Sequence, residues 1–122
     1  YAGAPQKTQA LIRKVVSEIF RNAPDGMPGD DDLGATSGMS LFFTLGMYPL
    51  MPGVPEFCLT GSLYESVKIK LDNGSEIIIK TTGDTWSTVK SISVDGEKSD
   101  EPFININPII ENKGKIEIEY EY

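Results

Sequence analysis

The stretch that decides the fold of this chain lies between two helical patterns and reads Pro24-Asp25-Gly26-Met27-Pro28-Gly29-Asp30-Asp31-Asp32-Leu33-Gly34. Its prolines and glycines interrupt the helical pattern, and it carries three consecutive carboxylates. Burial of an unpaired carboxylate is costly, so such a cluster stays solvated or serves a ligand, a cation or a proton transfer. Since no Lys or Arg occurs between Arg21 and Lys68, we expect the function of the chain to lie in this loop.

Helical periodicity flanks the loop on both sides. From about Thr8 to Arg21 the apolar residues recur at helical spacing, with Arg13 among the polar residues of the opposite face, and Thr8 can cap the start. The segment 35–45 is apolar nearly all round, which predicts a deeply buried second helix that ends at Gly46. Two such helices cannot cover each other, so the sequence indicates a longer natural protein with further helices upstream.

The period changes to two after about Phe57. Residues 67–71 and 76–80 flank an Asn-Gly pair, which predicts a β-hairpin, and 88–94 predicts a further strand. Residues 115–122 alternate strictly and place Ile116, Ile118, Tyr120 and Tyr122 on one face. The predicted fold class is therefore α+β, with helices in 1–55, a rigid connector at 48–55, and a small antiparallel β-sheet or half-sandwich in 56–122.

Composition excludes several classes of function. A net charge of −7 and a pI near 4.5 argue against a nucleic-acid partner, which requires a basic face. No apolar run is long enough for a membrane span. The chain has no histidine, which removes Ser-His-Asp and Cys-His chemistry and the usual zinc sites, so a bound metal would take hard oxygen ligands and would be calcium or magnesium. Cys58, the single cysteine, is expected to be a buried apolar residue.

The residues alone leave three interpretations of the carboxylates open. Asp32 could cap the second helix, where the helix dipole favours acids. The cluster could bind calcium, although Leu33 and the absence of a later acid exclude an EF-hand loop. It could also supply a general base, as in inverting glycosidases, whose two carboxyl groups stand roughly 6.5–9.5 Å apart. Because Asp30 and Asp32 are only two residues apart, they would share one role and the acid would come from elsewhere.

Several motifs occur together in the order and spacing of a known family: Tyr1-Ala2-Gly3, Lys7-Thr8-Gln9, the loop 24–34, Leu45-Gly46-Met47-Tyr48-Pro49 and Pro52-Gly53. In these motifs the chain resembles the C-terminal part of glycoside hydrolase family 92. Members are bacterial calcium-dependent exo-α-mannosidases, mostly α-1,2. The resemblance covers residues 1 to about 80, and the segment beyond about 100 is a generic strand pattern.

The resemblance implies that the two helices belong to an (α/α)6 barrel and that the whole protein removes mannose from glycans with inversion. It makes Asp32 the candidate general base and Asp30 its helper, with Asp31, Gly34 and Ser37 as candidate substrate-binding residues. The general acid, a glutamate in this family, would lie upstream, together with most ligands of the implied calcium ion. On this hypothesis the isolated chain is inactive and its partner is the upstream part of the same polypeptide.

The chain also departs from the family pattern. Where relatives typically carry Gln-Met-Ser-Ala-Trp-Tyr, residues 35–40 keep only the serine, Ser37, in register. A non-catalytic carbohydrate-binding or calcium-binding module is therefore an alternative, with Trp86 as a sugar platform or, more simply, a core anchor. A purely structural domain that self-associates through its helix faces is another. The cellular location stays open.

Overall fold

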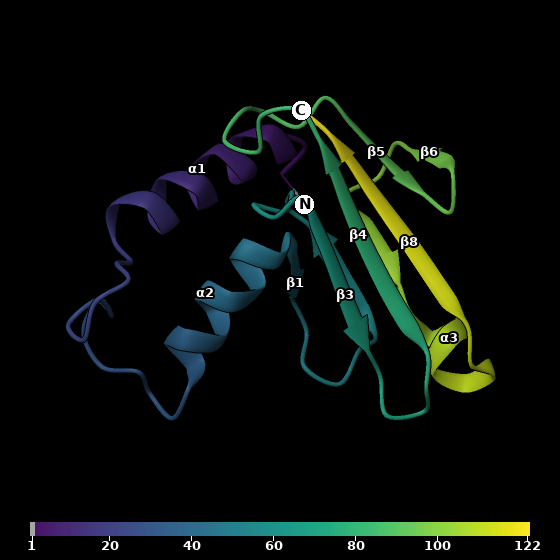
Figure 1. Ribbon diagram of the computed structural model, residues 1–122, viewed down its shortest axis with the longest axis horizontal. Coiled ribbons are helices and arrows are strands. Elements are labelled where there is room, and N and C mark those ends of the chain that lie inside the picture. The colour runs from purple at the N-terminus through teal and green to yellow at the C-terminus, as the bar shows by residue number, and fades with distance from the viewer. Residues whose placement is uncertain (1) are drawn as a thin grey trace.

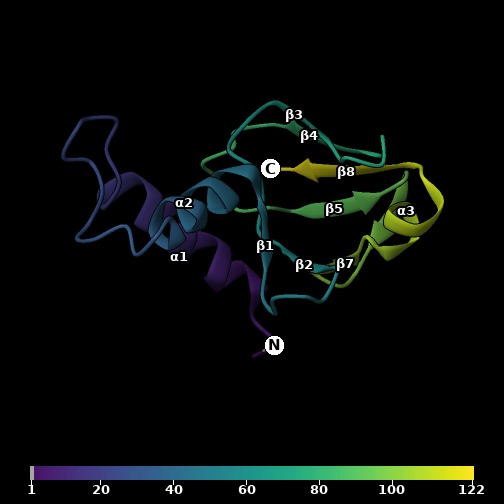
Figure 2. The same cartoon turned by 90° about the horizontal axis from the view of Figure 1, so that it is seen from below.

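The computed structural model describes residues 2–122, which form two helices at one end of two facing β-sheets (Figures 1 and 2). The helices are α1 (Pro5–Glu18) and α2 (Ala35–Leu45), and a short α3 (Asn107–Asn112) precedes the last strand. One sheet has the order β1-β2-β7, and the other has the order β3-β4-β8-β5-β6. The strands are β1 (Met47–Pro49), β2 (Glu56–Leu59), β3 (Ser66–Lys70), β4 (Glu76–Thr82), β5 (Ser91–Val94), β6 (Glu97–Ser99), β7 (Phe103–Asn105) and β8 (Lys115–Glu121).

The predicted α+β class is confirmed, and so is the hairpin, in which Val67 of β3 pairs with Ile79 of β4. One strand pair differs from the antiparallel expectation, because β8 runs parallel to β4. β8 enters the sheet after α3 and lies between β4 and β5. It is antiparallel to β5. The larger sheet is therefore mixed. Residues 48 and 49 of the expected connector belong to β1, and the division into domains 1–55 and 56–122 stays a prediction.

A single hydrophobic cluster joins the two sheets. It includes Leu59 and Ile104 from the smaller sheet and Ile79 and Ile118 from the larger one, and Ile79 and Ile118 are fully buried. Tyr120 and Tyr122 belong to the same cluster, as the alternating pattern of β8 predicted. The strict alternation of buried and exposed residues along β8 thus gives the sheet one core face and one solvent face.

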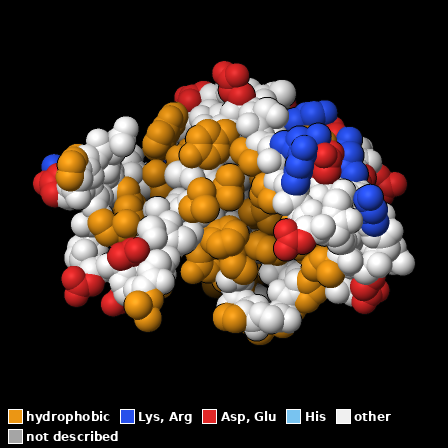
Figure 3. All heavy atoms as spheres, turned by 60° about the horizontal axis from the view of Figure 1, so that its bottom comes forward, with side chains coloured by type: hydrophobic (Ala, Val, Ile, Leu, Met, Phe, Trp, Pro, Cys, Tyr) orange, Lys and Arg blue, Asp and Glu red, His pale blue; other side chains and the backbone are white. Residues whose placement is uncertain are grey.

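The helices differ from expectation at their boundaries and in their burial. α1 begins at Pro5, with proline in the first turn, and Thr8 therefore does not cap it. Arg13, predicted on the solvent face, is only 6% exposed. α2 contains no buried residue despite its apolar sequence, and Leu41 is 54% exposed. Figure 3 shows the resulting broad area of apolar side chains on one face of the molecule.

The segment 60–63, which we call the anchor segment, holds the C-terminal end of α2. The Thr60 amide donates to the Gly46 carbonyl at 2.7 Å, and the Leu63 amide donates to the Thr44 carbonyl at 3.0 Å. The Tyr120 hydroxyl donates to the same Gly46 carbonyl at 2.7 Å. Gly46 has φ of +86° and lies so close to the anchor segment that a Cβ would stand 2.3 Å from the amide nitrogen of residue 62. Only glycine fits this helix end.

None of the described helices is long and apolar enough to cross a membrane.

Gly61 gives a test of this close packing. It has φ of +86°, and an added Cβ would lie 2.7 Å from a Val89 methyl carbon. We expect Gly61→Ala to lower the free energy of unfolding by about 2–4 kcal/mol, from backbone strain and overpacking together. Gly96 has a similar φ of +82° but open space around it, so Gly96→Ala should cost about 1 kcal/mol. Urea unfolding followed by circular dichroism measures both, and equal losses would contradict the close packing at Gly61.

The solvent face of the larger sheet gives a test by pH. Glu117 forms ion pairs with Lys115 and Lys80, and these contacts lower its pKa from 4.5 to about 2. A lowered pKa in the folded state stabilises the fold above pH 4.5, and this contribution disappears as the pH falls through about 2.

We therefore expect the difference in urea midpoint between the wild-type chain and Glu117→Gln to shrink as the pH is lowered from about 6 to about 2. Glu119→Gln is the control, because Glu119 lies on the same strand and forms no ion pair within residues 2–122. A constant difference between the wild-type chain and Glu117→Gln across this range would show that the ion pairs do not stabilise the fold.

Candidate functional site

The loop between the helices, residues 19–34, is here called the carboxylate loop. Its first part is a tight turn in which the Arg21 amide donates to the Gly26 carbonyl at 3.0 Å. Gly26 is buried, and a Cβ there would lie 1.8 Å from the Arg21 carbonyl oxygen, so the turn requires glycine. Arg21 also pairs with Asp25 at 2.9 Å. The one basic residue of the loop is thus engaged within the turn and leaves the three following aspartates unneutralised.

The second part of the loop has a left-handed backbone. Asp32 and Leu33 have φ of +50° and +59°, and Gly34 follows at +92°. A residue other than glycine in this region costs roughly 1–2 kcal/mol, so two adjacent ones are a strained feature of the kind that clusters at functional sites. Leu33 is fully exposed at the tip. The strain therefore falls on the candidate base and on its neighbour.

Asp31 supports the start of α2. Its carboxylate accepts hydrogen bonds from the Ser37 amide at 2.7 Å and from the Ser37 hydroxyl at 3.1 Å. Gly34 occupies the N-cap position without a side-chain cap, so the expectation that Asp32 caps the helix is wrong. Because of the left-handed turn, it is Asp31, one residue before Asp32, whose carboxylate reaches a free amide at the start of α2. A role in substrate binding stays a prediction for Asp31, Gly34 and Ser37.

Asp30 and Asp32 have free carboxylates. Both residues are exposed, and neither side chain forms a hydrogen bond or ion pair within the described residues, although the Asp30 carbonyl accepts from the Thr36 hydroxyl at 3.1 Å. A free carboxylate on a fixed backbone can accept a proton from water or bind the hydroxyl groups of a ligand. This arrangement suits the proposed pair of carboxylates that share one role.

The described residues do not form a metal centre. No group of three or more acidic, cysteine or histidine side chains in residues 2–122 could hold a metal ion. The Asp31 carboxylate already accepts two hydrogen bonds from Ser37. The residues present therefore do not fit a calcium ion by themselves.

The sequence also made predictions for Trp86 and Cys58. Trp86 is 54% exposed, so the core-anchor interpretation is wrong, and its amide donates to the Asp84 carboxylate at 3.0 Å. Cys58 is half-buried, and burial raises the pKa of its thiol, which disfavours the thiolate. This argues against a nucleophilic role, as the sequence predicted, although Cys58 is less buried than expected.

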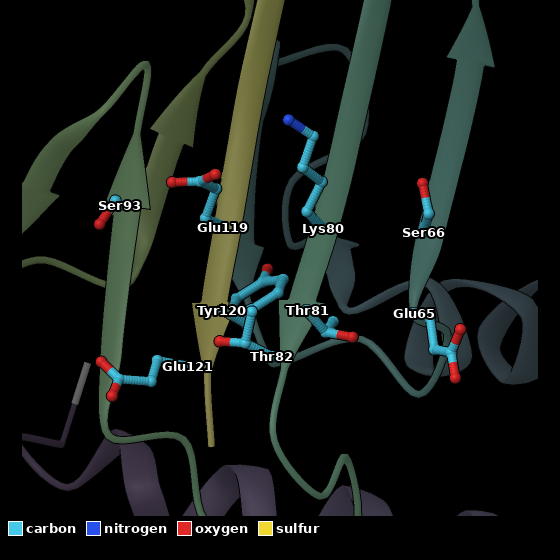
Figure 4. Close-up of a pocket in the computed structure, with 9 residues that line it drawn as sticks. All are labelled: Glu65, Ser66, Lys80, Thr81, Thr82, Ser93, Glu119, Tyr120 and Glu121. Carbon is cyan, nitrogen blue, oxygen red and sulfur yellow. The ribbon is translucent and has the colours of Figure 1, made fainter.

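Two grooves of the molecule lie away from the carboxylate loop. A groove of 570 Å³ lies on the outer face of the larger sheet, where Lys80, Glu119 and Glu121 line it (Figure 4). A second groove of 340 Å³ is lined almost entirely by apolar side chains, among them Leu11 of α1 and Phe43 of α2. The second groove leaves apolar surface of α1 and of the C-terminal end of α2 uncovered.

Comparisons with known proteins agree with this arrangement. A family model described as the glycosyl hydrolase family 92 catalytic domain matches residues 1–121. An uncharacterized secreted glycosidase from Arthroderma benhamiae is 28% identical over 97 residues, which are 80% of this chain and 11% of that protein.

The fold is also similar to solved structures. A family GH92 alpha-mannosidase from Bacteroides thetaiotaomicron, in complex with mannoimidazole, matches with a TM-score of 0.83 and 24% identity, over 96% of this chain and 15% of that one. A family GH92 inverting mannosidase from the same organism gives a TM-score of 0.81 and 24% identity, over 98% and 16%. Each comparison thus matches most of this chain to a small part of a longer protein. With residues 1–121 covered by its model, the chain belongs to glycosyl hydrolase family 92.

Proposed function

We propose that this chain is the part of an inverting, calcium-dependent exo-α-mannosidase that contributes the carboxylate loop to the active site. The substrate is a mannose-containing glycan, and the bond cleaved is α-1,2. The two helices belong to an (α/α)6 barrel that the rest of the polypeptide completes. The observation that carries the proposal is a pair of free, exposed carboxylates, Asp30 and Asp32, on a strained turn of a family 92 chain.

Asp32 is the general base of this proposal. Its carboxylate takes a proton from a water molecule as the oxygen of that water attacks the anomeric carbon from the face opposite the leaving group. A general acid upstream of this chain gives its proton to the departing glycosidic oxygen, so the product is the β-anomer of mannose. Asp30, two residues before the base, is its helper in this proposal, because its free carboxylate can accept a hydrogen bond from the attacking water and orient it.

The uncovered helix faces support a composite site. α2 has no buried residue and Leu11 of α1 is 61% exposed, so these helices need apolar partners. The same polypeptide supplies these partners in the proposal, because relatives of known structure are several times longer than the matched region. The isolated chain therefore lacks the acid and is inactive, and the calcium ion takes its ligands outside residues 2–122.

A non-catalytic carbohydrate-binding role is the second candidate, and the exposure of Trp86 favours it. An exposed indole ring can stack on the apolar face of a sugar, and Trp86 lies in a polar loop with Asp84 and Ser87. On this alternative the isolated chain binds mannose or mannobiose, and Trp86→Ala abolishes the binding.

Hydrolysis of α-1,2-mannobiose by the full-length parent tests the proposed function. We expect Asp32→Asn to lower kcat by about 10²–10⁴-fold, the usual contribution of a general base. Proton NMR at early times should show β-mannose as the first product, and a calcium chelator should stop turnover. The 122-residue chain alone should release no mannose.

The control is the free energy of unfolding of the wild-type parent and of its Asp32→Asn variant. The Asp32 side chain is exposed and forms no hydrogen bond or ion pair in the described chain, so its replacement should leave this free energy unchanged. A parent whose turnover is the same with aspartate or asparagine at residue 32 would exclude Asp32 as the base. Turnover that survives the chelator would exclude the calcium dependence.

Asp31 and Asp32 form a matched pair for separating structure from chemistry. Asp31→Ala removes the acceptor of the Ser37 amide, so we expect it to lower the free energy of unfolding of this chain by about 1 kcal/mol, as for other helix caps. Asp32→Asn should change it by less than about 0.5 kcal/mol, because the side chain is exposed and asparagine tolerates the left-handed backbone as well as aspartate does. Urea unfolding of the two variants measures both effects, and the reverse order would contradict a stabilising role of Asp31 at the first turn of α2.

A further inference from the structure

A buried arginine lies where α1 contacts the sheets. The Nε of Arg13 donates to the Thr85 carbonyl at 2.9 Å, and its Nη1 donates to the Gln9 carbonyl at 3.2 Å. The guanidinium carbon lies 5.0 Å from the ring centroid of Tyr122. Arg13 is only 6% exposed and forms no ion pair among residues 2–122, in a chain of 18 acidic residues.

Packing alone does not account for an arginine at this position. A buried charge without a carboxylate partner is costly, and an apolar side chain of similar size often serves stability better. The second terminal nitrogen of Arg13 is buried without a hydrogen-bond partner in the described chain, which adds to the cost. What the planar guanidinium offers instead is fixed geometry, because the carbonyl of Thr85 and the ring of Tyr122 together set its orientation.

Tyr122 connects this contact to α2. Its hydroxyl donates to the Ser62 carbonyl in the anchor segment, which also holds the end of α2 through the Thr60 amide and the Gly46 carbonyl. A Cβ at Gly61 would lie 2.8 Å from Arg13 Nη2 and 2.8 Å from the Tyr122 hydroxyl, so the contact is tightly closed. The two helices that carry the carboxylate loop are therefore fixed at one common place.

A small tilt of α2 at the anchor segment produces a larger displacement at the carboxylate loop. At 1.5 Å per residue, α2 places its first residue roughly 16 Å from Gly46, and a tilt of about 4° moves that end by about 1 Å. A displacement of this size can cost about 10²-fold in rate when a catalytic group is misplaced. The position of Asp32 thus depends on how α1 and α2 are held at the anchor segment.

We infer that Arg13 is a positioning residue, which fixes the angle between α1 and α2 through Tyr122 and so places Asp30 and Asp32. The inference rests on the proposed function for its catalytic consequence. Its structural consequence, the order of the carboxylate loop, does not depend on catalysis.

The kinetic test uses the full-length parent with α-1,2-mannobiose. Arg13→Met should lower kcat by about 10²-fold with KM nearly unchanged, and Arg13→Lys should restore part of kcat. Lys14→Met is the matched control on the same helix, because Lys14 is exposed and its side chain has no contact in the described chain. It should keep the wild-type kcat.

Azide separates a misplaced base from unfolded protein. Azide attacks the anomeric carbon without help from a base, the glycosidic oxygen leaves with the proton of the upstream acid, and the product is β-mannosyl azide. Azide should therefore raise the turnover of Arg13→Met, whereas an unfolded fraction would not respond. An unchanged kcat in Arg13→Met, or a loss that azide does not relieve, would overturn the inference.

Hydrogen exchange of the same proteins gives the second readout, which remains valid if the parent hydrolyses no mannoside. Amides of residues 19–34 should exchange faster in Arg13→Met than in Lys14→Met, while the strands of the larger sheet stay protected. Equal exchange of the loop in both variants would overturn the inference. A parent without turnover would instead refute the proposed function.

Discussion

Two buried tyrosine hydroxyls hold the helices of this chain against its sheets. Tyr120, in β8, donates to the Gly46 carbonyl, and Tyr122, directly after the end of β8, donates to the Ser62 carbonyl. Burial raises the pKa of both phenols, so each remains a neutral donor. The two ring centroids lie 6.5 Å apart, and the two hydroxyls reach two different parts of the helical end.

The sequence predicts those features that depend on local period. The alternation of β8, the Asn-Gly hairpin and the existence of both helices follow from neighbouring residues and agree with the structure. The parallel pairing of β4 and β8 and the burial of Arg13 depend on contacts between residues far apart in the chain. The spacing of Gln9 and Arg13, one helical turn apart, is a weak sign of a shared buried face, because the same spacing also occurs on solvated faces.

The carboxylate loop shows the same division. Composition places the acids in a turn before a helix, but it assigns no separate role to each. The roles differ because residues 32–34 have a left-handed backbone. This backbone turns the Asp31 carboxylate toward the Ser37 amide and leaves the Asp32 side chain without a hydrogen bond in the described chain. A left-handed backbone at Leu33 has no local sequence signal, and the signal at Asp32 is weak, because aspartate tolerates this geometry but glycine, the usual residue there, follows only at Gly34.

The loop is held mainly from its ends. Within the loop and the first turn of α2, side chains contribute few restraints on the strained segment, and Asp31 provides two of them. Two residues other than glycine in left-handed geometry cost about 1 kcal/mol or more each, which these contacts offset only in part. The remainder must come from α1 and α2, but α2 has no buried residue in this chain and Leu11 of α1 is exposed. Packing of further apolar side chains against the exposed faces of α1 and α2 would therefore stabilise both the fold and the geometry of the free carboxylates. A site composed of distant parts of one polypeptide requires this coupling.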